Sequence, residues 1–133
     1  RSLVNIVKSN RLCHYHNLAP LVVSRLRLIP DSKDKPILLD VREVEEVNIS
    51  KLKGDDVEYL PLSEIATAAD KKDSFIQLLP EKIKDQDQQI VILCAGGVRS
   101  AQVASIFDKY GWNKIANLEG GIKQYGADVG LNK

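Results

Sequence analysis

Residues 89–100 read Gln-Ile-Val-Ile-Leu-Cys-Ala-Gly-Gly-Val-Arg-Ser, and this stretch carries the clearest structural signal in the chain. Its first half is apolar and rich in β-branched side chains, which favour a strand that is buried on both faces of a sheet. Cys94 and the glycine pair Gly96-Gly97 follow the apolar run directly. The pattern therefore predicts a buried parallel strand that ends in a tight loop beginning at Cys94.

The residues beyond this loop have the spacing of a helix. Val103, Ile106, Phe107 and Tyr110 recur at intervals of three and four, which places them on one apolar helix face. Gly111 then supplies the residue type that commonly ends a helix. A strand, a glycine-rich loop and a helix in this order put the loop at the carboxyl end of a parallel strand, where open α/β sheets bind their ligands.

Short apolar runs and helical patterns alternate through the rest of the chain. We predict strands over residues 37–41, 57–60 and 114–118, and a first strand near residues 12–15. We predict helices over residues 18–28 and 73–79 and from residue 121 to 125. This alternation predicts an α/β fold, an open parallel sheet of four to five strands flanked by helices on both faces. We expect a single domain over residues 1–133, with a core at about 36–125 and an extension at 1–11.

The composition excludes several classes of protein. The chain has 133 residues, 44% of them hydrophobic and 28% charged, which is typical of a folded globular domain. Its net charge of +1 gives no reason to expect a nucleic-acid or membrane partner. The chain begins at Arg1 and has no methionine, which predicts a processed form or a piece of a longer protein. We expect it in the cytoplasm, or in an organelle lumen if a transit peptide was removed.

Cys94 is the main candidate for chemistry. Glycines beside it allow successive N–H groups to converge on an anion, and the N-terminus of the following helix favours negative charge there. Arg99 adds a positive charge, and such surroundings lower the pKa of a thiol and so increase its reactive thiolate form. Ser100 can cap the helix or offer its hydroxyl to the sulfur. A buried cysteine can also serve only as a small apolar residue, and this alternative stays open on these residues alone.

The loop at residues 94–100 resembles the active-site loop of rhodanese-type sulfurtransferases, which reads cysteine-x-x-glycine-x-arginine followed by a small residue. Three other segments resemble motifs of that family in the expected order. Residues 38–43 match its aspartate-valine-arginine signature, residues 59–65 its strand-to-helix turn and residues 117–122 its late glycine pair. The resemblance runs from about residue 36 to 125 and implies a rhodanese-like fold.

The resemblance also implies roles for particular residues. Cys94 is expected to be the catalytic residue and to carry sulfur as a persulfide. The substrate-binding cradle is expected to consist of Ala95, Gly96, Gly97, Val98, Arg99 and Ser100. Asp40 and Arg42 are expected to be structural and to organise loops near the site as an ion pair.

The function implied is sulfur transfer. Such an enzyme takes a sulfane sulfur from a small-molecule donor such as thiosulfate and passes it to an acceptor, which can be a thiol, cyanide or a sulfur-carrier protein. Neither a metal nor an organic cofactor is expected, because each step is a displacement at sulfur. Dual-specificity phosphatases place arginine six residues after cysteine, whereas here Arg99 comes five residues after Cys94, which favours a tighter pocket sized for a persulfide.

Two alternatives stay open. Residues 46–52 and 127–130 are similar to runs in the C-terminal rhodanese domain of ubiquitin-activating-like enzymes of the molybdopterin synthase sulfurylase type. Those domains supply sulfur to a ubiquitin-like carrier for tRNA thiolation or molybdopterin synthesis. The second alternative is a non-catalytic rhodanese-like interaction module, but such modules usually lose the cysteine, which is retained here. The chain departs from the family at Ser50-Lys51, often histidine or glycine-histidine, and at Tyr125, often tryptophan.

A second cluster of reactive residues lies near the start of the chain. Cys13, His14 and His16 offer three possible metal ligands within four residues. The spacing suggests no fourth ligand, and the cluster precedes the segments that resemble rhodaneses. We therefore predict no metal site there.

Overall fold

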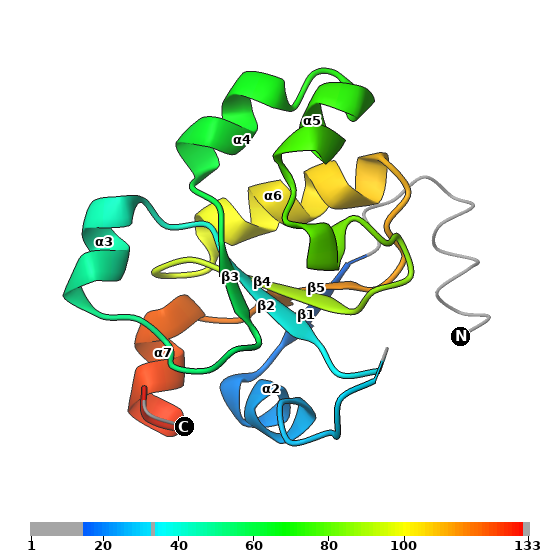
Figure 1. Ribbon diagram of the computed structural model, residues 1–133. Helices are drawn as coiled ribbons and strands as arrows, with labels where there is room; N and C mark the ends of the chain where they lie inside the picture. Colours follow the sequence, from blue (N-terminus) through cyan, green and yellow to red (C-terminus); the bar gives the residue numbers. More distant parts are fainter. Residues whose placement is uncertain (1–14, 33, 132–133) are drawn as a thin grey trace.

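The structure is a computed structural model that describes residues 15–32 and 34–131. Its centre is a sheet of five parallel strands in the order β1-β5-β4-β2-β3 (Figure 1). The strands are β1 (His16–Leu18), β2 (Ile37–Asp40), β3 (Val57–Tyr59), β4 (Ile90–Leu93) and β5 (Ile115–Leu118). The predicted α/β class is confirmed, with five strands.

Helices cover both faces of this sheet (Figure 1). One face carries α4 (Leu62–Ala68), α5 (Lys72–Leu78), the short 3-10 helix η1 (Glu81–Ile83) and α6 (Val98–Lys109). The other face carries α2 (Pro20–Leu26) and α7 (Gly121–Asp128). The remaining helix, α3 (Val44–Ile49), follows β2 and has no buried residue. No helix of the described residues is both long and apolar enough to cross a membrane.

The central strand β4 explains why the sheet is buried on both sides. Ile90 and Ile92 pack into the core beneath α4, α5 and α6, whereas Val91 and Leu93 pack into the core beneath α2 and α7. This alternation follows from the period of two along a strand. All four residues are buried, so β4 is fixed from both faces and holds the position of Cys94 at its carboxyl end.

The beginning of the described chain differs from the prediction. The first described strand is β1 at residues 16–18, which is later than the predicted strand at 12–15. Residues 12–14 of that prediction and the expected extension at 1–11 lie outside the described residues. The helix predicted over 18–28 is shorter, because Leu18 belongs to β1 and pairs with Leu118. Pro20 then occupies the start of α2, where its missing N–H costs no helical hydrogen bond.

Two helices have no counterpart among the predicted ranges. Helix α4 follows the strand-to-helix turn that the sequence predicted at residues 59–65, but no range was predicted for the helix itself. Helix α3 is short and exposed, and therefore has no apolar periodicity to reveal it. Its start is stabilised by a capping box, in which the side chains of Glu43 and Glu46 each accept a hydrogen bond from the other's backbone.

Candidate active site

The backbone of the Cys94 loop is held from behind by α7. The N–H of Ile122 donates to the carbonyl of Cys94 at 2.8 Å, and the N–H of Lys123 donates to the carbonyl of Ala95 at 3.2 Å. These are free N–H groups of the first helical turn, which need partners. Gly121 makes the approach possible: its φ is +66°, and a Cβ there would collide with the carbonyl groups of Cys94 and Ala95. The late glycine pair thus fixes the loop.

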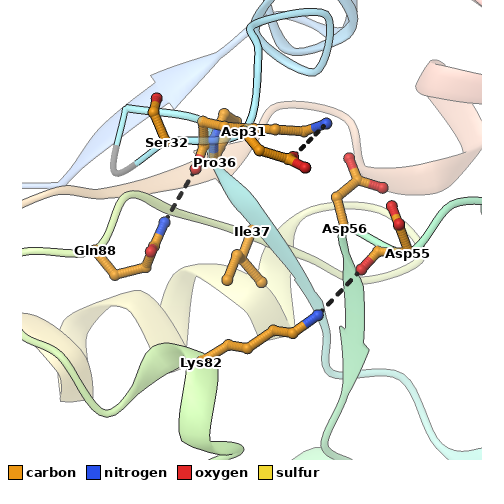
Figure 2. Close-up of a pocket in the computed structure, with 9 residues that line it drawn as sticks. Asp31, Ser32, Pro36, Ile37, Asp55, Asp56, Lys82 and Gln88 are labelled. Atoms are coloured by element: carbon orange, nitrogen blue, oxygen red, sulfur yellow. Dashed lines mark hydrogen bonds and ion pairs between the residues drawn. The ribbon is translucent and has the colours of Figure 1, made fainter.

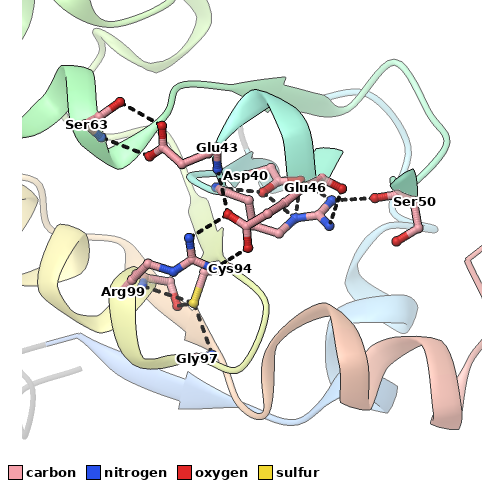
Figure 3. A network of polar contacts seen from close by, with 10 residues as sticks. Asp40, Glu43, Glu46, Ser50, Ser63, Cys94, Gly97 and Arg99 are labelled. Carbon is pink, nitrogen blue, oxygen red and sulfur yellow. Dashed lines mark hydrogen bonds and ion pairs between the residues drawn. The ribbon is translucent and has the colours of Figure 1, made fainter. Parts of the chain in front are cut away.

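Cys94 is 1% exposed, and its sulfur faces donors from its own loop. The N–H of Gly97 donates to Sγ at 3.1 Å and the N–H of Ser100 at 3.3 Å, while the Ser100 hydroxyl lies 3.3 Å from Sγ (Figure 3). Gly97 precedes α6 with φ +98°, a conformation that glycine adopts without strain. Gly96, in contrast, does not have a positive φ. The loop presents N–H groups to the sulfur as an anion site requires.

These contacts determine the ionisation of the thiol. Burial raises the pKa of Cys94, since a charge is costly away from water. The Ser100 hydroxyl opposes this effect by hydrogen bonding, followed by the amides of Ser100, Gly97 and Gly96. The hydrogen bonds prevail, and the pKa of Cys94 lies below its ordinary value. The lowered pKa was expected, and the contacts that lower it most are the hydrogen bonds from Ser100, Gly97 and Gly96.

Ser100 is itself held by a buried polar side chain on β5. Its hydroxyl donates to Oδ1 of Asn117, which is 5% exposed. Nδ2 of Asn117 donates to Oδ1 of Asn17 at 3.0 Å and to the carbonyl of Gly97 at 3.3 Å. Because the amide nitrogen has these two acceptors, Oδ1 faces Ser100. Neither Asn117 nor Asn17 was predicted as a site residue; the available signal was a polar residue inside the buried strand Ile115–Leu118.

Replacing Ser100 with alanine should raise the pKa of Cys94. The substitution removes the hydroxyl, the strongest of the contacts that favour the thiolate, and keeps the helix and the amides. The rate of alkylation by iodoacetamide as a function of pH reports the thiolate fraction, and its midpoint should move to higher pH. Ser105→Ala, on the exposed side of the same helix, should leave the midpoint in place. A midpoint that stays unchanged in Ser100→Ala would contradict the assigned role.

Arg99 lies at the start of α6, and its side chain points to α3. Its two terminal nitrogens each donate to one carboxylate oxygen of Glu46, both at 2.7 Å. This bidentate pair raises the pKa of Arg99 and lowers the pKa of Glu46 to about 2, in each case chiefly through the hydrogen bonds between them. About one third of each side chain is exposed. The positive charge expected over the loop is therefore already paired with a carboxylate that our sequence analysis did not consider.

Asp40 and Arg42 form a second, buried ion pair at the end of β2 (Figure 3). Nε and Nη2 of Arg42 donate to the two carboxylate oxygens of Asp40, the shortest contact being 2.8 Å. Nη2 also donates to the carbonyl of Ser50, at the end of α3, at 2.8 Å. Nη1 donates to the carbonyl of Glu46, within α3, at 3.4 Å. The side chains are 1% and 4% exposed. Arg42 thus connects β2 to α3, the helix that presents Glu46 to Arg99.

A family model described as the rhodanese-like domain matches residues 26–128. The chain belongs to this family. A rhodanese-like/PpiC domain-containing chloroplastic protein of Arabidopsis thaliana is 36% identical over 100 residues, which cover 75% of this chain and 30% of that protein. A tRNA uridine(34) hydroxylase of Protochlamydia amoebophila is 29% identical over 100 residues, 75% of this chain and 29% of that protein. The rhodanese-like domain therefore spans about 30% of the length of these relatives.

Solved structures support the fold. The single-domain sulfurtransferase RDL2 of Saccharomyces cerevisiae superposes with a TM-score of 0.68 at 23% identity, covering 90% of this chain and 96% of that one. A rhodanese-like domain protein of Staphylococcus aureus superposes with a TM-score of 0.63 at 26% identity, covering 88% and 96%. The expected rhodanese-like sheet with helices on both faces is thus confirmed.

A hollow of about 250 Å³ lies elsewhere in the rhodanese-like domain (Figure 2). It is lined by residues at the amino ends of β2, β3 and β4, such as Ile37, Asp56 and Gln88, whereas Cys94 follows the carboxyl end of β4. Several of its charged groups have partners: Lys35 lies 3.7 Å from Asp31, Lys82 lies 3.7 Å from Glu58, and Asp56 accepts a hydrogen bond from Arg27 at 2.8 Å. It shares no residue with the cysteine site.

The cluster considered for metal binding falls mostly outside the residues that the structure describes. Cys13 and His14 are not described, and His16 is an exposed residue of β1. Among residues 15–32 and 34–131, no group of three or more histidine, cysteine, aspartate or glutamate side chains is arranged to hold a metal ion. That no metal binds at Cys13 and the histidines remains a prediction.

Proposed function

We propose that this rhodanese-like domain is a sulfurtransferase in which Cys94 carries a sulfane sulfur as a persulfide. The observation that carries the proposal is the position of Sγ, which accepts the N–H groups of Gly97 and Ser100 at the carboxyl end of the central strand. Such donors stabilise a thiolate, and a thiolate is the nucleophile of sulfur exchange. Membership of the family supports the same activity.

The transfer takes two displacement steps. The Cys94 thiolate attacks the outer sulfur of thiosulfate, so that a new S–S bond forms and the old S–S bond breaks with its electron pair leaving on sulfite. The persulfide then carries its charge on the outer sulfur, within the loop formed by residues 95–100. An acceptor such as a thiol, cyanide or a sulfur-carrier protein attacks that outer sulfur, and the electron pair of the S–S bond returns to Cys94. Sulfur and electrons balance without a redox cofactor.

Mass spectrometry of the intact protein tests the proposal. After incubation with thiosulfate or with a small alkyl persulfide, the wild-type protein should gain the mass of one sulfur atom. Cyanide should then remove the added mass and release thiocyanate. Cys94→Ser should gain nothing, whereas Cys13→Ser, which keeps the site cysteine, should behave as wild type. No adduct from any donor, or an adduct that persists in Cys94→Ser, would leave the domain as a non-catalytic interaction module.

A protein acceptor is a second candidate for the same chemistry. Val98, inside the loop, is 72% exposed, and an apolar side chain in that position suits contact with another protein better than with cyanide. This agrees with the resemblance to domains that supply sulfur to a ubiquitin-like carrier. Persulfidated protein mixed with an adenylated carrier should form an acyl disulfide with release of AMP, and a thiol reductant such as dithiothreitol should then cleave its S–S bond and release the carrier thiocarboxylate if this candidate is correct. Persulfide that is consumed by cyanide but never by the carrier would exclude it.

A further inference from the structure

The charged side chains near Cys94 are paired with one another or with neighbouring polar groups. The polar network drawn in Figure 3 contains three carboxylates, those of Asp40, Glu43 and Glu46, and two guanidinium groups. Arg42 is paired with Asp40 and Arg99 with Glu46, while Glu43 accepts hydrogen bonds from Ser63 at 2.7 and 3.1 Å. Each guanidinium of this network is therefore already paired with a carboxylate.

We propose that Glu46 determines donor specificity: by holding Arg99, it disfavours dianionic donors such as thiosulfate and favours persulfides of low charge. The inference rests on the proposed sulfurtransferase function and specifies its donor class. Glu46 acts through Arg99 and is a positioning residue. It does not touch the sulfur of Cys94, whose described donors are the loop amides and the Ser100 hydroxyl.

The leaving groups of the two donor classes differ in charge. When Cys94 attacks thiosulfate, the departing sulfite keeps two negative charges and three oxygens that need donors. When it attacks the outer sulfur of an alkyl persulfide, the S–S bond breaks to release an alkyl thiolate with one negative charge. A guanidinium is the group best suited to sulfite, because its fork binds oxyanions in two places. In the structure this fork is occupied by Glu46, whose carboxylate also offsets the charge of Arg99, so Arg99 attracts sulfite less than an unpaired arginine would.

The local structure holds Glu46 firmly in this position. Its Oε2 also accepts the N–H of Glu43 at 3.0 Å, which is half of the capping box of α3. Arg42 also stabilises α3 by donating a hydrogen bond to the backbone carbonyl of Glu46. The carboxylate is therefore oriented before any ligand arrives, and the pair with Arg99 needs little ordering to form.

One substitution at Glu46 tests the charge of its side chain separately from its role in capping α3. Gln at this position of a capping box still accepts the backbone hydrogen bond, so Glu46→Gln should keep α3 and remove the charge. Glu45 is an exposed carboxylate on the same helix turn, and Glu45→Gln makes the same change in net charge without touching Arg99. The two variants form a matched pair.

The measurement compares kcat/KM for two donors, thiosulfate and the persulfide of 2-mercaptoethanol, with cyanide as acceptor. The ratio of thiosulfate to persulfide activity does not depend on the fraction of protein that is folded. We expect the ratio to rise about tenfold in Glu46→Gln, which corresponds to about 1.4 kcal/mol, and to stay unchanged in Glu45→Gln. In the double variant Glu46→Gln/Arg99→Gln the gain should disappear, because the released guanidinium is its source.

An unchanged ratio in Glu46→Gln would overturn the inference, and so would an equal rise in Glu45→Gln, which would assign the effect to net charge alone. A gain that survives removal of Arg99 would also overturn it. The failure of the underlying function has a different signature: neither donor would then place sulfur on Cys94 in any variant. The two failures are thus distinguished by the intact mass of the wild-type protein.

Discussion

Arg42→Met is expected to lower the free energy of unfolding by about 3–5 kcal/mol, because it leaves the buried carboxylate of Asp40 without its partner. Methionine retains much of the length of the arginine stem, so the loss comes mainly from the charge and the hydrogen bonds. Those hydrogen bonds include the contacts to the carbonyls of Glu46 and Ser50. Urea denaturation measures the effect as a lower midpoint with an unchanged slope.

Two companion variants make this prediction specific. Arg25 is an exposed arginine on α2, and Arg25→Met should change stability by no more than about 0.5 kcal/mol. The double variant Asp40→Leu/Arg42→Met removes both charges and should recover a large part of the loss, because no buried charge is left unpaired. If Arg42→Met costs no more than Arg25→Met, the buried pair does not have the structural role assigned to it.

Gly121→Ala is expected to be the most damaging glycine substitution at the site. A non-glycine residue at φ +66° carries a conformational penalty of about 1–2 kcal/mol, and the collision with the carbonyls of Cys94 and Ala95 adds to it. Since those carbonyls belong to the loop, the substitution should displace Cys94 as well as destabilise the fold. We expect a lower melting temperature together with slower persulfide formation per folded molecule.

Gly126 provides the control for this prediction. It lies in the same helix without a positive φ, and a Cβ there would meet nothing closer than 3.5 Å. Gly126→Ala should therefore stabilise the protein by about 0.5–1 kcal/mol through helix propensity. The two substitutions are chemically identical and should act in opposite directions. A melting temperature of Gly121→Ala at or above the wild-type value would show that α7 does not constrain the loop as described.

The sequence predicts the parts of the fold that depend on local pattern. Strand β4 lies within one residue of the apolar run, and helix α6 contains Val103, Ile106 and Phe107 of the helical pattern and ends just before Gly111. These elements are buried on defined faces, so their patterns reflect the core directly. Helix α3 could not be found in this way, because no residue of it is buried and only its capping box marks it.

The candidate site was predictable to a similar degree and for related reasons. Cys94, Gly97 and Ser100 lie within seven residues, and one loop brings them together. The partners that complete the site come from far along the chain: Glu46 is 53 residues from Arg99, and Asn17 is 100 residues from Asn117. Such pairings depend on strand order and on how α3 lies against α6, which no local pattern contains.

The single hydroxyl proton of Ser100 links the ionisation of Cys94 to the side chain of Asn117. In the neutral state the thiol can donate to Ser100 while the hydroxyl donates to Asn117, and in the ionised state the same hydroxyl can turn its proton to the sulfur. In the ionised state Oδ1 of Asn117 therefore loses this donor, because the hydroxyl has a single proton. The amides of Gly97 and Ser100 already point at the sulfur, where the charge appears. The loop amides are therefore in place to stabilise the negative charge of the thiolate before any sulfur donor binds.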